Sequence, residues 1–156
     1  MSTQDNHNYR NYTMSTTGDV NPDGTGKQPD FWDVGDALSV GLSGSGALTV
    51  EGVGVVSSTN GFLGWKSGSA GEAIITGSAA RWHNSEKLTV GFYGEGALTV
   101  AAQGEVSNTE GTIGEHTGST GEVTVTGLDS HWSNSSWLTV GDKRLEYAKR
   151  GLAPDR

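Results

Sequence analysis

Gly44-Ser-Gly-Ala-Leu-Thr-Val50 and Gly94-Glu-Gly-Ala-Leu-Thr-Val100 are nearly the same sequence and stand fifty residues apart. The likeness extends outward on both sides, because residues 32–81 aligned on 82–131 without a gap keep 22 identical residues. A third copy begins at Trp132 and stops after about ten residues. The chain is therefore a tandem repeat, in which a residue that returns in every copy is explained first by the scaffold.

Within each copy, apolar residues return again at half the interval. Two series have a spacing of 25: Val50, Ile75, Val100 and Val125, and Leu48, Ala73, Leu98 and Val123. Members of the two series flank one intervening residue, and this alternation predicts a β-strand with one apolar face. A third series alternates intervals of 23 and 27: Val40, Leu63, Val90, Ile113 and Val140. A fourth opens short polar strands: Val56, Trp82, Val106 and Trp132.

Three short strands in every 25 residues, separated by glycine-rich turns, are typical of one coil of a parallel β-helix. We therefore predict an all-β solenoid of about four coils, each of about 25 residues. An antiparallel meander or sandwich is the alternative, but it would not require the same residue type to return at each interval.

Two polar series are expected to stack as well. The first is an outer threonine ladder: Thr49, Thr76, Thr99 and Thr126. The second is expected at turn entries, where side-chain oxygens can accept hydrogen bonds from backbone amides: Asn84 and Asn134, with Thr59 and Thr109 between them.

Composition restricts the function. Hydrophobic residues make up only 33% of the chain and 25 residues are glycine, which predicts a thin, regular core. Residues 1–141 hold five Lys/Arg and fifteen Asp/Glu, a charge of −10, so we expect no nucleic-acid binding. The absence of cysteine excludes disulfides and thiolate metal sites. No run approaches the roughly 18 apolar residues of a membrane span, so we expect no membrane insertion by this segment.

The predicted organisation has three parts. Residues 1–31 form a flexible or capping arm, residues 32–141 hold the repeats (32–81, 82–131 and a partial 132–141), and residues 142–156 form a cap or tail. The tail is predicted to be a short amphipathic helix, with an acidic partner as the alternative to a capping role. The N-terminus has no apolar stretch after a basic start, which predicts no signal peptide in the chain as given. The repeat that ends near residue 141 favours a piece of a larger protein.

The repeat resembles a known bacterial family. The resemblance rests on Trp82-His-Asn-Ser-Glu-Lys-Leu-Thr-Val-Gly91, Gly94-Glu-Gly-Ala-Leu-Thr-Val100, Gly104-Glu-Val-Ser107, Thr112-Ile-Gly114 and Gly118-Ser-Thr-Gly-Glu-Val-Thr-Val-Thr-Gly127. These strings resemble the repeat of autotransporter passenger regions and of bacterial surface proteins with a PEP-CTERM sorting tail. The resemblance covers about residues 32–141 and implies a right-handed parallel β-helix at the cell surface or secreted, with a structural or adhesive role.

Catalytic and cofactor sites are not expected. Glycoside hydrolysis needs two carboxyl groups in a groove, whereas Glu72 and Glu122 occupy equivalent repeat positions and should stack two coils apart. We predict no catalytic residue and no cofactor. A carbohydrate-binding or polysaccharide-degrading fragment, similar to a tailspike or a lyase, is the alternative. One loop has calcium-binding spacing, with Gly24 at position 6 and oxygen ligands at Asp19, Asn21, Asp23 and Asp30; a polar lead-in arm is the alternative reading.

The two copies differ most informatively in their aromatic residues. Leu42-Ser43 becomes Phe92-Tyr93, and Trp65-Lys66 becomes Glu115-His116. The candidate ligand-binding residues are Trp65, Phe92 and Tyr93, which would contact a surface glycan or a host or cell-surface protein; drifted positions that shield a turn are the alternative. The end coils of a solenoid also expose unpaired backbone groups, so end-to-end self-association is a further expectation.

Overall fold

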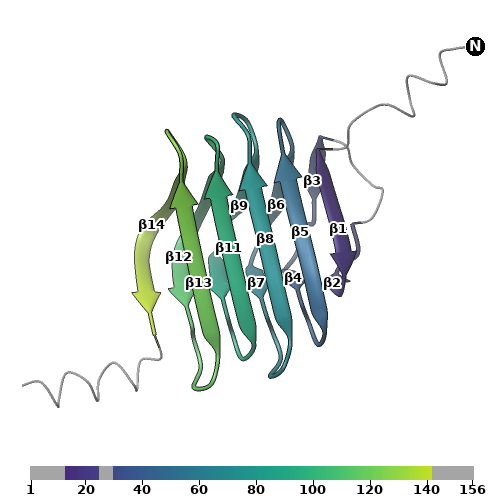
Figure 1. Cartoon of the computed structure of the whole chain (residues 1–156), viewed down its shortest axis with the longest axis vertical. Coiled ribbons are helices and arrows are strands. Elements are labelled where there is room, and N and C mark those ends of the chain that lie inside the picture. The colour runs from purple at the N-terminus through teal and green to yellow at the C-terminus, as the bar shows by residue number, and fades with distance from the viewer. Residues whose placement is uncertain (1–12, 25–29, 142–156) are drawn as a thin grey trace, which may run out of the picture.

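The structure is a computed structural model that describes residues 13–24 and 30–141, and this part of the chain is a parallel β-solenoid without helices. Its coils stack side by side from one end of the molecule to the other (Figure 1). The first coil contains β3 (Phe31–Asp33), β4 (Leu38–Val40) and β5 (Ser45–Glu51), the second β6 (Val55–Ser58), β7 (Gly61–Leu63) and β8 (Ala70–Thr76), the third β9 (Arg81–Asn84), β10 (Lys87–Val90) and β11 (Glu95–Ala101), and the fourth β12 (Glu105–Ile113) and β13 (Thr120–Thr126). The strand β14 (His131–Val140) begins a fifth turn, and β1 (Met14–Gly18) and β2 (Val20–Asn21) precede the first.

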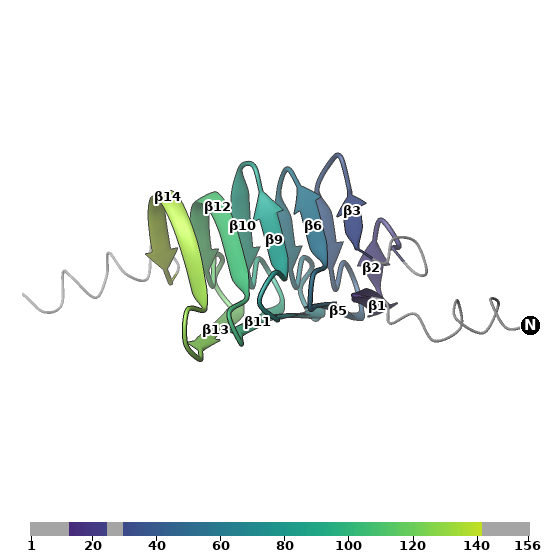
Figure 2. The same ribbon diagram turned by 90° about the horizontal axis from the view of Figure 1, so that it is seen from above.

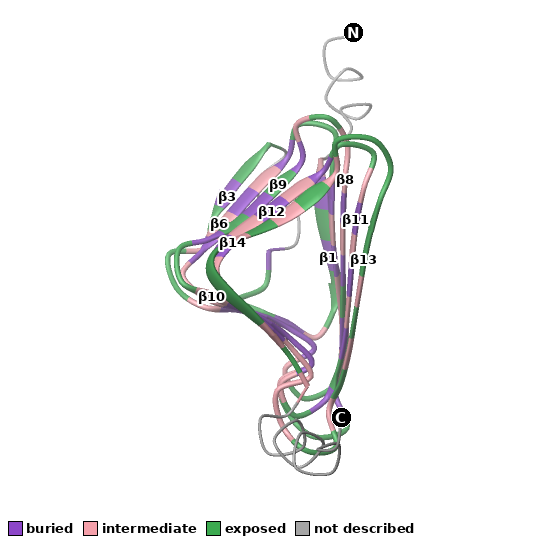
Figure 3. Ribbon diagram, turned by 90° about the vertical axis from the view of Figure 1, so that its left-hand side faces the viewer, coloured by how far each residue is buried: buried purple, intermediate pink, exposed green. Residues whose placement is uncertain are grey.

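The coils present three faces around a thin core. One face is the five-stranded sheet β1-β5-β8-β11-β13, and the others belong to the nine-stranded sheet β2-β4-β7-β10-β12-β9-β6-β3, where β14 also pairs with β12. The long strands β12 and β14 run around the corner between the two faces of the nine-stranded sheet, which Figure 2 shows from above. Viewed along the stack, the coils outline a triangle (Figure 3). No helix of the described residues is long and apolar enough to span a membrane.

The apolar ladders are confirmed by the strand register. Val50 pairs with Ile75, Ile75 with Val100, and Val100 with Val125. The other three series stack in the same way along their faces. Through the first three coils these side chains point into the core and are almost fully buried. Stacked β-branched and aliphatic side chains suit a pleated surface, so the repeat interval directly sets the fold.

The expected threonine ladder is wrong at alternate steps. The ladder was expected to contain Thr49, Thr76, Thr99 and Thr126. The register of the five-stranded sheet advances by 25 at every step, so Thr49 pairs with Ile74 and Ile74 with Thr99. Thr76 lies two residues further along its strand and pairs with Glu51.

The expected turn ladder of asparagine and threonine is also wrong. It was expected to contain Asn84 and Asn134 with Thr59 and Thr109. Asn84 pairs with Ser58, because the second coil has 26 residues between Val56 and its partner Trp82. The Asn84 side chain lies inside the coil, where its Oδ1 accepts a hydrogen bond from the Ser58 hydroxyl at 2.7 Å. The Asn84 oxygen is therefore satisfied in the core instead of binding a turn amide, whereas its buried Nδ2 has no hydrogen-bond partner among the described residues.

Part of the lead-in arm closes the first coil. The strands β1 and β2 run antiparallel to their neighbours β5 and β4, whereas the coil-to-coil pairs are parallel. Their side chains Met14 and Val20 are 8% and 7% exposed and belong to the core. Gly24 lies over the Trp32 ring, where an added Cβ would come 2.5 Å from the indole. The tail 142–156 lies outside the described residues.

Candidate functional site

The predicted aromatic residues lie on loops at one corner of the triangle. These loops cover residues 41–44, 64–69, 91–94 and 114–119, and each leads from the nine-stranded to the five-stranded sheet. The loops alternate between four and six residues in length. The intervals of 23 and 27 in the series that starts at Val40 differ by four residues, and the loops account for two of these four. Backbone hydrogen bonds join consecutive loops: the Phe92 amide donates to the Gly64 carbonyl at 3.0 Å, and the His116 amide to the Phe92 carbonyl at 3.2 Å. Residues from different copies are thereby brought side by side.

Five rings gather at this corner, and we call them the aromatic cluster: Phe62, Trp65, Phe92, Tyr93 and His116. Phe92 is central, with its ring centroid 4.9 Å from Trp65, 4.8 Å from Tyr93 and 4.7 Å from His116. Phe62 packs edge-on against Trp65 at 4.3 Å. The Tyr93 and His116 rings stack at 4.0 Å with an interplanar angle of 4°. All three predicted residues therefore belong to one cluster.

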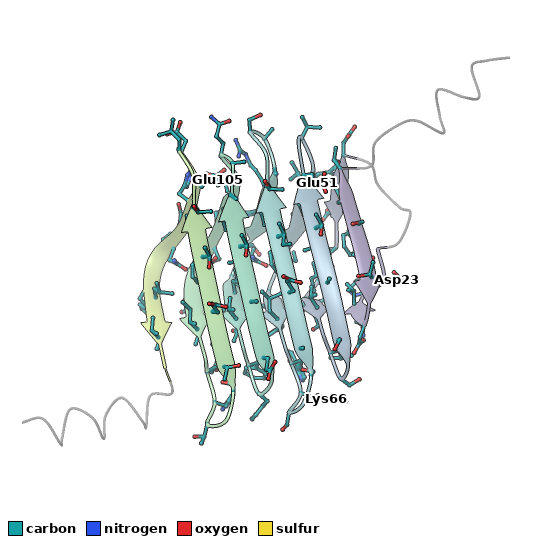
Figure 4. The ribbon with its side chains drawn as sticks, in the orientation of Figure 1. Asp23, Glu51, Lys66 and Glu105 are labelled. Atoms are coloured by element: carbon teal, nitrogen blue, oxygen red, sulfur yellow. The ribbon has the colours of Figure 1, made fainter. Side chains whose placement is uncertain are left out.

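The aromatic cluster is open to solvent and has a polar margin. Tyr93 is 46% exposed, and the other four rings are half-buried. Beside them the Lys87 ammonium donates to the Glu115 carboxylate at 2.8 Å, and the Thr89 hydroxyl donates to the same oxygen at 3.4 Å. Lys66 follows Trp65 in the chain and marks this corner at the lower edge of the molecule in Figure 4. Flat apolar rings next to hydrogen-bonding groups can bind a ligand that has both an apolar face and hydroxyl groups.

Two members of the aromatic cluster were missed by the sequence reasoning. Phe62 lies on the outward side of β7, between Ser39 and Thr89 of the neighbouring coils. It is a phenylalanine where the second copy has Thr112, so a comparison of outward positions between copies could have found it. His116 appeared only as the replacement for Lys66, and nothing in its spacing indicated that it would stack on Tyr93.

A ladder of charged and polar side chains lies at the opposite edge of the molecule, near Glu105 in Figure 4. Arg81, Glu105 and His131 occupy equivalent places on three consecutive coils. Glu105 binds Arg81 at 3.0 Å with one carboxylate oxygen and His131 Nε2 at 2.7 Å with the other. The hydrogen bond to Glu105 and a weaker one to the Asp129 carbonyl raise the pKa of His131 above its usual 6.5. This ladder joins coils electrostatically and is a structural feature.

A shallow hollow on the five-stranded sheet has acidic margins. It lies over small residues of four parallel strands and β1, and its charged lining residues are Glu72, Glu95 and Glu122. Glu72 and Glu122 both pair with Ala97, so they stand two coils apart as the repeat predicts. Among residues 13–24 and 30–141, no Lys or Arg lines the hollow.

The calcium-like loop has a different use in the described residues. The Asp19 carboxylate accepts hydrogen bonds from the Ser43 amide at 2.6 Å and the Gly44 amide at 2.7 Å, which lower its pKa below 3.8. Asn21 lies in β2, and Asp30 directly precedes β3. Among residues 13–24 and 30–141, no three His, Asp or Glu side chains are grouped as a metal site would require. Asp19, Asp23 and Asp30 therefore form no such group among the described residues. Residues 25–29 of the loop lie outside the described residues, so the calcium site at Asp19, Asn21, Asp23 and Asp30 stays a prediction.

No family model, curated protein or solved structure matches the chain.

Proposed function

We propose that this chain is a non-catalytic structural and adhesive module of a bacterial cell-surface or secreted protein of the autotransporter-like type. The aromatic cluster carries the proposal. It is built at positions where the two copies differ, so the scaffold does not account for it. Four of its five side chains come from loops of three consecutive coils, and the solenoid holds those loops rigidly through backbone hydrogen bonds. The proposed ligand is a surface glycan or a cell-surface protein.

The chemistry of the aromatic cluster favours contact over catalysis. Exposed aromatic rings stack on the apolar faces of sugars and on partner side chains with little loss of conformational entropy. The nearby carboxylate of Glu115 is held by Lys87 and Thr89, and Glu105 on the far edge is held by Arg81 and His131. These two carboxylates have structural partners that would compete with a role as acid or base.

A binding experiment tests the proposal. The full chain is applied to a glycan array and to immobilised bacterial and host cell surfaces, with and without the triple substitution Trp65→Ala, Phe92→Ala and Tyr93→Ala. The triple variant should lose at least about tenfold in affinity, because aromatic anchors dominate such contacts. Phe31→Ala is the matched control, since Phe31 is 52% exposed but lies on β3, away from the aromatic cluster.

Unchanged binding by the triple variant, or equal losses in both variants, would remove the aromatic cluster from the proposal. Circular dichroism and thermal unfolding of each variant establish that the solenoid is intact before binding is compared.

The hollow with glutamates at its margins supports a second candidate, a carbohydrate-active fragment. Glu72, Glu95 and Glu122 point outward from neighbouring strands of one sheet face. Polysaccharide lyases combine carboxylates with Lys or Arg, and the part of the chain that the structure describes contributes neither cation to the hollow, which places this candidate second. A reducing-sugar assay on acidic polysaccharides, repeated with Glu95→Gln and Glu122→Gln, decides the matter: release of sugar that these substitutions abolish would establish it.

A further inference from the structure

The two ends of the described solenoid differ sharply in exposure. Leu138 and Val140 in the last turn are 46% and 59% exposed, whereas their equivalents Leu88 and Val90 are fully buried. These residues occupy core positions of the repeat, and their exposure follows from the lack of a further coil within the described residues. Other apolar side chains exposed at or near this end are Val125 at 43%, Trp137 at 59% and Leu128 at 81%. This C-terminal end face points towards the viewer in Figure 3.

The N-terminal end of the solenoid shows how this chain covers the core of an end coil. Leu38 and Val50 belong to the first coil and are nevertheless fully buried. The chain achieves this with β1 and β2, which add a short antiparallel layer across the end of the stack. Capping segments of this kind protect solenoids from solvent and from edge pairing. The C-terminal end face has the same need for cover.

We propose that residues 142–156 of the same chain dock on the C-terminal end face and cap it. The segment is in place to do so, since it starts directly after Gly141, which follows β14. Its fifteen residues can span up to about 50 Å when extended, about twice the extended length of the seven-residue strand β13. It also supplies apolar side chains at Leu145, Tyr147 and Leu152.

Charge complementarity selects this occupant over a second copy. Residues 101–141 form the last turns of the solenoid and hold five Asp/Glu and no Lys/Arg, a charge of −5. Residues 142–156 hold five Lys/Arg and three Asp/Glu, a charge of +2. A second copy of the solenoid would bring another acidic surface to the end face, whereas the tail brings opposite charge at a high local concentration.

A paramagnetic label tests the contact directly. The chain has no cysteine, so Ala148→Cys provides a single site for a nitroxide. In the full-length 15N-labelled protein, the label should broaden the amide signals of Val125, Leu138 and Val140 severalfold more than those of Met14 and Val20 at the other end. Equal broadening at both ends, or none at the last turn, would overturn the proposal.

Two controls make the test specific. Substituting Lys143, Lys149, Arg144 and Arg150 with glutamine should reduce the broadening at Val125 severalfold, while Lys66→Gln, on the aromatic corner, should leave it unchanged. A mixture of nitroxide-labelled unenriched chains with unlabelled 15N chains reports contacts between molecules. In that mixture, the end-face signals should broaden less than in the chain that carries both the nitroxide and 15N. Equally strong broadening would show that a second copy occupies the end face and would overturn docking of the chain's own tail.

Discussion

At the residue scale, the repeat separates positions that the scaffold requires from positions that it leaves open. Gly96 is required: an added Cβ would lie 2.6 Å from the Leu63 carbonyl oxygen, inside the corner where two coils meet. Gly91 turns the chain at this corner with a φ of +85°, which favours glycine. The next two residues, Phe92 and Tyr93, project from the loop and differ between copies. A position that differs between the copies and lies next to a glycine that the fold requires is therefore the best sequence indication of a ligand-binding role.

His131 gives a prediction about pH. Its hydrogen bond to Glu105 raises its pKa in the folded state above the unfolded value of about 6.5. The pair therefore stabilises the fold fully below about pH 6.5, and this contribution is lost as the pH rises through the folded pKa. Titration of the His131 ring by NMR should give a pKa above 6.5 that falls in Glu105→Gln. The destabilisation caused by Glu105→Gln should also be larger at about pH 5.5 than at about pH 8.5.

Glu110→Gln is the control, because Glu110 also lies on β12 but does not belong to the ladder with His131. A His131 pKa that stays the same in Glu105→Gln would contradict the assigned cause.

At the scale of elements, the N-terminal cap formed by β1 and β2 does what a further coil would otherwise do. Asp19 joins the N-terminal cap to the loop 41–44, because the Asp19 carboxylate accepts hydrogen bonds from two backbone amides of that loop. Each amide hydrogen bond favours the ionised carboxylate, as it would at a helix N-cap. The segment that resembles a calcium loop in sequence thus performs a structural role through its first residue.

Asp19→Asn tests that role. The hydrogen bonds from Ser43 first, and then Gly44, lower the pKa of Asp19 in the folded state. The stabilisation is therefore present above the unfolded pKa of about 3.8 and is lost as the pH falls through the lower folded value. Asp19→Asn should lower the unfolding midpoint near pH 7, and the difference from wild type should shrink at strongly acidic pH. Asp33→Asn, at the start of the same coil, serves as the comparison, and an equal effect of both variants at every pH would refute the capping role.

The sequence predicted strand partners correctly where the repeat interval is constant and wrongly where it alternates. The interval of 25 placed Val50 and its partners correctly, because the five-stranded sheet advances by that number at each step. Asn84 was assigned the wrong partner, because intervals of 24 and 26 residues alternate on the face that contains β6, β9 and the start of β12. The sequence identified Trp65, Phe92 and Tyr93 but could not show that they touch, since their contact depends on how loops of two lengths stack. His116 was missed for the same reason, whereas Phe62 lies on β7 and a comparison with its counterpart Thr112 could have found it.

At the scale of the whole molecule, the solenoid is nearly one-dimensional: each coil contacts its neighbours, and stability is close to a sum of coil and interface contributions. The five-stranded sheet pairs each strand only with the strands before and after it in the stack. Damage in one coil should therefore affect the two sides of the molecule unequally. The N-terminal side retains its antiparallel cap, and the other side relies on the last turns alone within the described residues.

Leu98→Ala tests this one-dimensional behaviour. Leu98 is 1% exposed in the third coil, between Ala73 and Val123, so its truncation should cost about 2–5 kcal/mol. Thr99→Ala, on the outward side of the same strand, should cost under about 1 kcal/mol. Native-state hydrogen exchange should then show the amides of β13 and β14 losing more protection than those of β4 and β5, because the latter remain packed between the cap and an intact second coil. An equal loss of protection throughout would instead mean that the coils unfold as a single cooperative unit, and that the ends have no separate stability for a cap to supply.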